Sequence, residues 1–306
     1  MTINTLDTLD ILDYSQPTLI AGPTASGKSA LALALSERTG GVIVNADALQ
    51  VYRCWRALSA RPSEADERAA PHALYGHIEC ETAYSVGDWL REIAPFLKAS
   101  APPIIVGGTG LYFTSLTEGL AKIPPTDPAI RATAMARIEQ GDVTGMLREL
   151  LVQDPETVEK IDQNNPMRIQ RAWEVWQSTG RGLASWQRDT GAPLLPLPQA
   201  NALLVDAPKD WLTPRIETRF QAMLEHGALD EARAVLPAWH EGMPAAKAIG
   251  AAELIAHLKG VITIEQATEA ATIATRQYAK RQRSWFRSRM KRWTQISGPD
   301  IALKFG

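Results

Sequence analysis

The sequence predicts an α/β fold in which helices cover a parallel sheet and an all-helical segment is inserted into the chain. Short apolar runs typical of buried strands occur at residues 18–21, 42–44, 104–106 and 202–205, and helix-like stretches separate them. The strand pattern disappears between about residues 124 and 190. We therefore expect one α/β core formed by residues 1–120 and 201–306, with a helical insertion at 121–200. A separate C-terminal domain is the alternative.

Capping residues indicate where the helices begin and end. The first starts near residue 28 and stops at Gly40-Gly41, and another begins near Ser85. In the insertion, Asp127-Pro128 and Asp154-Pro155 each place an N-cap before a proline in the first turn, and a third helix is predicted at 167–179. Thr213-Pro214 predicts a further helix, and the last long helix is expected at about 264–293.

The composition is that of a soluble globular protein. Of the 306 residues, 45% are hydrophobic and 22% are charged, and no apolar run reaches the length of a membrane span. The stretch through Gln16 contains no Lys or Arg, which argues against a secretory signal or a transit peptide. The two cysteines, Cys54 and Cys80, predict no disulfide framework. We expect a cytoplasmic protein with no membrane partner.

The most informative motif is a glycine-rich phosphate-binding loop between the first strand and the first helix. It has the form G-x-x-x-x-G-K-[ST] and consists of Gly22, Pro23, Thr24, Ala25, Ser26, Gly27, Lys28 and Ser29. Its backbone N–H groups and the helix N-terminus can hold a phosphate, Lys28 supplies a positive charge, and the Ser29 hydroxyl can bind Mg²⁺. The motif predicts a sheet similar to that of P-loop NTPases and a phosphate ligand of unspecified kind.

Two further loops follow strands and are expected at the same edge of the sheet. Asp47 comes after the second strand and could be a Mg²⁺ ligand, a general base or a helix cap. Gln50 carries a donor and an acceptor that suit a base edge, although a solvated side chain is the simpler interpretation. The turn Gly107-Gly108-Thr109-Gly110 could hold an anion or be a structural turn.

The last helix has a charge pattern that favours nucleic acid. Residues 276–292 contain eight Lys or Arg and no acidic residue, although the whole chain has a net charge of −2. Arg276, Lys280, Arg283 and Arg287 fall on one helical face. A solvated face usually mixes both signs, so a one-sided basic face favours contact with a phosphate backbone.

Together these motifs resemble the tRNA dimethylallyltransferase family. The match rests on the phosphate loop, Asp47-x-x-Gln50-Val51-Tyr52, Val106-Gly107-Gly108-Thr109-Gly110-Leu111-Tyr112, Asn165-Pro166-x-Arg168-x-x-Arg171, Arg215-Ile216-x-x-Arg219-Phe220 and Thr275-Arg276-Gln277-Tyr278-Ala279-Lys280-Arg281-Gln282. The motifs occur in the right order over nearly the whole chain. Ala48, Ser59-Ala60-Arg61-Pro62 and Gly250-Ala251-Ala252-Glu253 depart from the usual pattern.

The resemblance implies transfer of a dimethylallyl group from dimethylallyl diphosphate to the N6 amine of the adenosine just 3′ of a tRNA anticodon. By position, Asp47 would be the general base, Thr109 and Arg219 would stabilise the leaving diphosphate, and the phosphate loop would bind it with Mg²⁺ at Ser29. The helical insertion would grip the anticodon stem, and the protein is expected to be a monomer. The residues expected to contact tRNA are Asp47, Ala48, Leu49, Gln50, Arg131, Met167, Arg168, Ile169, Gln170, Arg171, Lys247, Gly250, Lys280, Arg281, Gln282, Arg283, Trp285 and Arg287.

Two other functions use some of the same residues. A small-molecule or nucleotide kinase would use the phosphate loop on ATP, but it would give the basic C-terminal helix no role. A nucleotide-gated RNA-binding module without chemistry would leave Asp47, Thr109 and Arg219 without a role. Both therefore account for fewer of the motifs than the transferase does.

Overall fold

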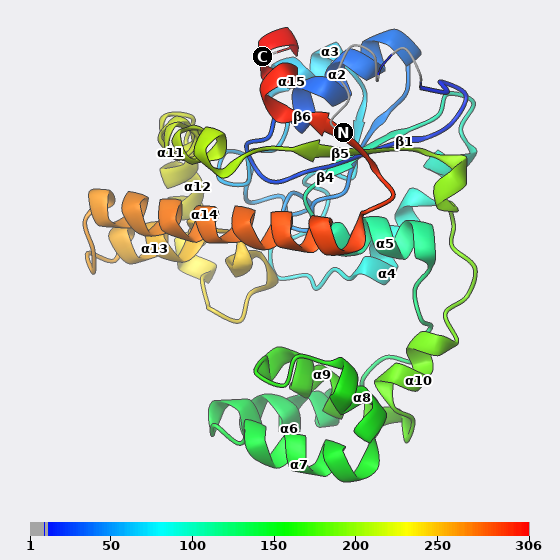
Figure 1. Cartoon of the computed structure of the whole chain (residues 1–306). Helices are drawn as coiled ribbons and strands as arrows, with labels where there is room; N and C mark the ends of the chain where they lie inside the picture. The colour runs from blue at the N-terminus through cyan, green and yellow to red at the C-terminus, as the bar shows by residue number, and fades with distance from the viewer. Residues whose placement is uncertain (1–8, 10–11, 306) are drawn as a thin grey trace. The chain divides into compact units, whose positions relative to one another are not determined.

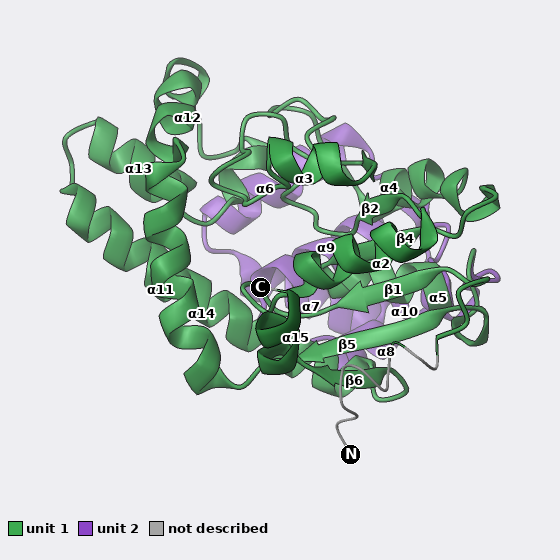
Figure 2. Cartoon of the chain, turned by 90° about the horizontal axis from the view of Figure 1, so that it is seen from above, with its two compact units in different colours: residues 1–117, 194–306 green, residues 118–193 purple. Residues whose placement is uncertain are grey.

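The computed structural model describes residue 9 and residues 12–305 of the chain (Figure 1). It divides into two compact units (Figure 2). Unit 1 consists of Met1–Thr117 and Leu194–Gly306, and unit 2 of Glu118–Pro193. The insertion predicted at 121–200 corresponds to unit 2, except that residues 118–120 also belong to unit 2 and residues 194–200 belong to unit 1.

Unit 1 contains a parallel sheet, as the sequence predicts, with six strands where the sequence indicates four. The strands are β1 (Thr18–Ala21), β2 (Ile43–Asn45), β3 (His72–Ala73), β4 (Ile104–Gly107), β5 (Asn201–Asp206) and β6 (Thr294–Ser297), in the spatial order β3-β2-β4-β1-β5-β6. Ala21 pairs with Gly107, and Asn45 pairs with Val106. This register brings the carboxyl ends of β1, β2 and β4 to one edge, where the three predicted loops begin.

Helices cover both faces of this sheet (Figure 1). One face carries α2 (Lys28–Thr39), α3 (Glu64–Ala69) and α15 (Gly298–Phe305), and the other carries α4 (Val86–Ile93), α5 (Gly110–Glu118) and α14 (Ile264–Arg289). Buried side chains of both layers pack on the strands, among them Leu31 and Ile301 on one side and Trp89 and Phe286 on the other. The other α-helices among the described residues of unit 1 are α11 (Lys209–Glu225), α12 (Ala228–Val235) and α13 (Ala251–Leu258).

Two helix bounds differ from the sequence prediction. Helix α11 begins at Lys209 and contains Pro214, and the Thr213 hydroxyl donates to the Lys209 carbonyl one turn back and does not cap a new helix. Helix α14 ends at Arg289 rather than near Trp293. After it, Trp293 packs into the core and residues 294–297 pair with β5 as an edge strand. Neither β3 nor β6 has the apolar run by which the other strands are recognised in the sequence.

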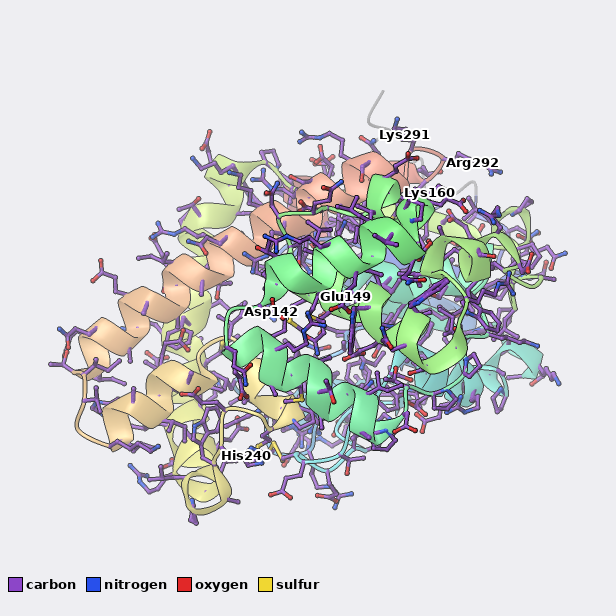
Figure 3. All side chains as sticks on the ribbon, turned by 90° about the horizontal axis from the view of Figure 1, so that it is seen from below. Asp142, Glu149, Lys160, His240, Lys291 and Arg292 are labelled. Carbon is purple, nitrogen blue, oxygen red and sulfur yellow. A yellow bond between two sulfur atoms is a disulfide. The ribbon has the colours of Figure 1, made fainter. Side chains whose placement is uncertain are left out.

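Unit 2 is entirely helical and has its own core. Its helices are α6 (Pro128–Glu139), α7 (Val143–Gln153), α8 (Pro155–Lys160), α9 (Pro166–Thr179) and α10 (Leu183–Arg188). Asp127 and Asp154 cap α6 and α8 through their side chains, as the sequence predicts. Arg137 of α6 forms ion pairs of 2.6 and 2.8 Å with Asp142 and Glu149, which lie at the start of α7 and two turns further along (Figure 3).

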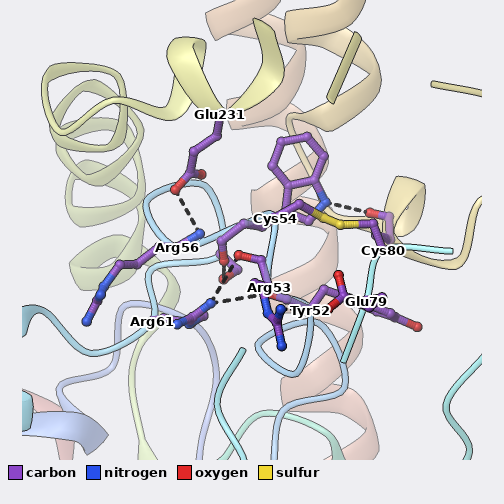
Figure 4. The surroundings of a disulfide bond; sticks show 11 residues. Tyr52, Arg53, Cys54, Arg56, Arg61, Glu79, Cys80 and Glu231 are labelled. Atoms are coloured by element: carbon purple, nitrogen blue, oxygen red, sulfur yellow. Dashed lines mark hydrogen bonds and ion pairs between the residues drawn. A yellow bond between two sulfur atoms is a disulfide. The ribbon is translucent and has the colours of Figure 1, made fainter. Parts of the chain in front are cut away.

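The expectation of no disulfide from Cys54 and Cys80 is wrong for this structure, in which the two sulfurs are bonded (Figure 4). Their Cα atoms lie 6.1 Å apart although 26 positions separate them in the chain. The reason is a short pairing between the two segments: the Arg53 N–H donates to the Ile78 carbonyl, and the Ile78 N–H donates to that of Val51. This pairing has no signal in the spacing of the cysteines.

In the part of the chain that the structure describes, no helix combines the length and the hydrophobicity needed to span a membrane.

Candidate active site

The phosphate-binding loop connects β1 to α2 through a backbone conformation that favours glycine. Gly27 precedes α2 with φ +87°, a left-handed conformation that glycine adopts without strain. The Lys28 ammonium donates to the Pro23 carbonyl at 3.1 Å, and Ser29 in the first turn of α2 is exposed. Burial and, after it, the Arg219 cation lower the pKa of Lys28 to about 8, while Asp47 acts in the opposite direction. An anion placed here would restore the full charge of Lys28.

Asp47 lies one residue beyond Ala46, on a turn that Asn45 holds. The Asp47 N–H donates to Asn45 Oδ1 at 2.8 Å, and Asn45 Nδ2 donates to the Asp47 carbonyl at 2.9 Å. One carboxylate oxygen of Asp47, Oδ1, accepts from the Leu49 N–H at 3.0 Å. This bond closes a turn and does not cap a helix, because the next helix of the chain is α3, which begins at Glu64. Within the described residues, the other oxygen, Oδ2, has no hydrogen-bond donor and is available to accept a proton.

The glycine-rich turn after β4 packs tightly on its neighbours. A Cβ at Gly107 would clash with the Ala46 backbone, and one at Gly110 would clash with the Trp285 ring. The Thr109 N–H donates to the Ala46 carbonyl at 3.2 Å, and Thr109 Oγ1 accepts from the Ala48 N–H at 2.9 Å. Much of this motif therefore fastens the Asp47 turn to the sheet, and the Thr109 hydroxyl hydrogen stays available for a further acceptor.

Two arginines of α11 reach toward the phosphate loop. Arg219 is half-buried with its Nε atom enclosed and without a hydrogen-bond partner among the described residues. Burial lowers the pKa of its guanidinium, against the opposing effect of Asp47. Arg215, one turn earlier, donates from Nε to the Ala25 carbonyl at 3.1 Å and lies 4.4 Å above the Trp211 ring. Arg215 has no predicted role, although its four-residue spacing from Arg219 indicates that both lie on one side of the helix.

These groups line one cavity in unit 1. It has a volume of about 550 Å³, within the usual range for small-ligand sites. The phosphate loop from Thr24 to Ser29, Asp47, Gln50, Arg215 and Arg219 all contribute to its wall. A second cavity of about 580 Å³ is lined partly by the same residues, including Ser29, Gln50 and Arg219. Thr109, which is bonded to the backbone of Ala46 and Ala48, does not line either cavity.

Glu231 of α12 forms hydrogen bonds with the backbone of the segment that begins at Arg56 (Figure 4). Its carboxylate accepts from the backbone N–H groups of Arg56, Ala57 and Leu58 at 2.7 to 3.0 Å. The next two carbonyls, of Ser59 and Ala60, accept from Gln50 Nε2 at 3.0 and 2.9 Å. The amide nitrogen of Gln50 is thus bound within the protein, and its carbonyl oxygen is the group left to face the cavity.

Comparison with known proteins decides the family. The model of the IPP transferase family matches residues 50–289, and an isopentenyl transferase model matches residues 16–70. A tRNA dimethylallyltransferase of Dinoroseobacter shibae is 60% identical over 95% of this chain and 98% of that protein. One of Cereibacter sphaeroides is 56% identical over 97% of this chain and 93% of that protein. This chain belongs to the tRNA dimethylallyltransferase family.

A solved structure agrees with this family and fold. The tRNA isopentenylpyrophosphate transferase of Bacillus halodurans superimposes with a TM-score of 0.65 at 27% identity, covering 93% of this chain and 90% of that one. The α/β fold and the transferase class predicted from the motifs are therefore confirmed.

In this member of the tRNA dimethylallyltransferase family, the residues expected to contact tRNA include exposed, half-buried and buried positions. In unit 2, Arg131, Met167 and Arg168 are exposed and Arg171 is half-buried, whereas Ile169 and Gln170 are buried and Gln170 bonds to Glu174. In unit 1, Lys247, Lys280, Arg281 and Arg287 are exposed. Asp47, Ala48, Leu49, Gln50, Arg283 and Trp285 are half-buried, whereas Gly250 and Gln282 are buried. The buried side chains have no open surface for a nucleic acid in this structure.

Proposed function

We propose that this chain transfers a dimethylallyl group from dimethylallyl diphosphate to the N6 amine of the adenosine immediately 3′ of the anticodon, in tRNAs that read codons starting with U. The observation that carries the proposal is that the phosphate loop, Asp47 and Arg219 line one cavity. Lys28 and Arg219 offer positive charge there, and the Asp47 carboxylate keeps one oxygen without a hydrogen bond within the described residues. A cation pair beside a free carboxylate suits an anionic leaving group opposite a nucleophile that must lose a proton.

The chemistry exchanges one bond for another. The N6 nitrogen forms a bond to C1 of the dimethylallyl group while the bond from C1 to the diphosphate oxygen breaks, and the pair of electrons leaves with the diphosphate. The amine proton passes to Asp47 Oδ2. An adenine amine is a poor nucleophile because its lone pair is delocalised into the ring, so a positioned base is useful. Lys28 and Arg219, which line the cavity, would stabilise the charge that develops on the diphosphate. The Thr109 hydroxyl, which does not line the cavity in this structure, would join them once its hydrogen turns toward the bound diphosphate.

The residues present fit a bound Mg²⁺. Ser29 places an exposed hydroxyl in the first turn of α2, and the described residues contain no cluster of three His, Cys, Asp or Glu side chains that would enclose a metal without substrate. Mg²⁺ commonly takes one or two protein oxygens and fills its other positions with water and phosphate oxygens. When bound at Ser29 with the diphosphate, it would neutralise negative charge on the leaving group.

The tRNA anticodon stem-loop would contact the exposed basic residues of α14 and those of α9. To reach the cavity, the adenosine must leave its stack, as bases do in other enzymes that modify them. We propose that the enzyme acts as a monomer. A tRNA substrate also favours a cytoplasmic location.

The product distinguishes this function from that of a kinase with the same loop. Purified protein is incubated with unmodified tRNA and dimethylallyl diphosphate, and released diphosphate and alkylated tRNA are both counted. Transfer predicts one diphosphate for each alkylated tRNA and no requirement for ATP. Consumption of ATP with phosphate transfer to a small acceptor would support the kinase instead.

A further inference from the structure

Helix α14 turns one face toward the active site and another toward solvent. Thr275, Tyr278, Gln282 and Trp285 recur every three or four residues, which places them on a single side of the helix. Thr275 and Tyr278 line the cavity, and Trp285 lies against Gly110. The same helix carries the exposed cations expected to contact tRNA. One helix therefore presents cations to solvent on one face and lines the cavity with the other.

Gln282 is the residue of this face that forms hydrogen bonds with both active-site loops. Its side chain is 6% exposed. The Thr24 N–H of the phosphate loop donates to Gln282 Oε1 at 3.0 Å, and Gln282 Nε2 donates to the Gly108 carbonyl at 2.9 Å. A Cβ at Gly108 would clash with Gln282 Nε2, so the glycine permits this close approach. One primary amide thus bridges the loops that follow β1 and β4.

The two ends of this bridge lie on opposite sides of the proposed reaction. Thr24 belongs to the loop that would hold the diphosphate. Gly108 precedes Thr109, whose hydroxyl is bonded to the Asp47 turn. We propose that Gln282 is a positioning residue that fixes the spacing between the diphosphate-binding loop and the general base. This inference rests on the proposed function, and it replaces the expectation of a direct tRNA contact for Gln282.

The geometry explains why other side chains would not serve. A methionine has a similar length but would leave the Thr24 N–H and the Gly108 carbonyl without their partners. A carboxylate could still accept from Thr24 but would place an oxygen against the Gly108 carbonyl, close to Asp47. Only a primary amide of this length satisfies both backbone groups at every pH.

The test compares Gln282→Met with Gln277→Met, the same change at an exposed glutamine of the same helix. Steady-state transfer of dimethylallyl to tRNA is measured, with thermal unfolding as a check on folding. Displacement of the diphosphate relative to the base predicts a kcat about 10- to 100-fold lower for Gln282→Met. Its KM for tRNA should stay within about twofold, as for a group that touches no tRNA. An unchanged kcat, or a raised KM for tRNA with kcat intact, would overturn the proposal.

A second variant keeps the proposal testable if Gln282→Met does not fold. In Gln282→Glu, the protonated carboxyl can donate to Gly108 and accept from Thr24, whereas the carboxylate cannot donate. The activity of Gln282→Glu relative to wild type should therefore rise as the pH falls. A ratio that does not vary with pH would contradict the bridging role. Wild-type activity in the same assay separates this result from a failure of the proposed function.

Discussion

The side-chain amide of Asn45 binds both backbone groups of Asp47: its Oδ1 accepts from the Asp47 N–H at 2.8 Å, and its Nδ2 donates to the Asp47 carbonyl at 2.9 Å. Asn45 is itself fully buried at the end of β2, and its Nδ2 also donates to the Leu74 carbonyl at 3.0 Å. The carboxylate that we propose as the base therefore sits on a turn with little freedom to move. This arrangement can be tested separately from the carboxylate itself.

Replacing Asn45 by Ala should reduce both stability and transfer. Loss of buried hydrogen bonds to the Asp47 turn is expected to lower the free energy of unfolding by about 1–3 kcal/mol. The rate per folded molecule should fall as well, because the base is no longer held. Asn201→Ala is a matched control, since Asn201 bonds to Asp13 away from the cavity. Urea unfolding and single-turnover transfer would show the difference, and equal effects of both variants on the rate would contradict the positioning role.

Diphosphate binding should take up a proton near pH 8. Burial and the Arg219 cation lower the pKa of Lys28 from its ordinary value of 10.5 to about 8, so the side chain is charged below pH 8 and neutral above it. An anion favours the charged form, so the affinity for inorganic diphosphate should fall as the pH rises through about 8. Calorimetry in buffers of different ionisation enthalpy measures the number of protons taken up for each diphosphate bound. Equal uptake by Lys28→Met would assign the proton to another group.

Arg219→Ala should affect chemistry far more than tRNA binding. If Arg219 stabilises charge on the departing diphosphate, its removal is expected to lower the single-turnover rate about 100- to 1,000-fold. The dissociation constant for tRNA should change little. Arg233→Ala, at an arginine on α12 that does not line the cavity, serves as the control. Equal losses in rate and in tRNA affinity would show that Arg219 does not have this role.

Neutralising Arg283 and Arg287 to Gln should weaken tRNA binding and flatten its dependence on salt. Each lost phosphate contact lowers the slope of log K against log salt by about 1, so the double variant should lower it by about 2. A double change at Arg68 and Arg91, on α3 and α4, removes the same charge elsewhere on unit 1. A slope equal to that of wild type would show that this face of α14 is solvated and does not contact tRNA phosphates.

Local sequence signals were sufficient for most of the fold and for the phosphate loop. The loop, its strand and its helix adjoin in the chain, and Asp-Pro caps act on the next few residues, so each could be predicted from short windows. The interactions that join distant segments could not be predicted. The Thr24–Gln282 bond spans 258 positions, and the pairing that brings Cys54 to Cys80 depends on backbone groups alone. The charge pattern of α14 groups Gln282 with the surface cations, because it does not reveal the buried face of the helix.

The measurement that most directly tests the account is transfer of label from radiolabelled dimethylallyl diphosphate to unmodified tRNA that reads codons starting with U. Wild type is compared with Asp47→Asn, and tRNA with adenosine 3′ of the anticodon is compared with tRNA carrying guanosine there. The account predicts labelled tRNA with wild type and adenosine only, and a rate about 100- to 10,000-fold lower for Asp47→Asn with tRNA still bound. Label that persists with guanosine, or a full rate without the Asp47 carboxylate, would contradict it.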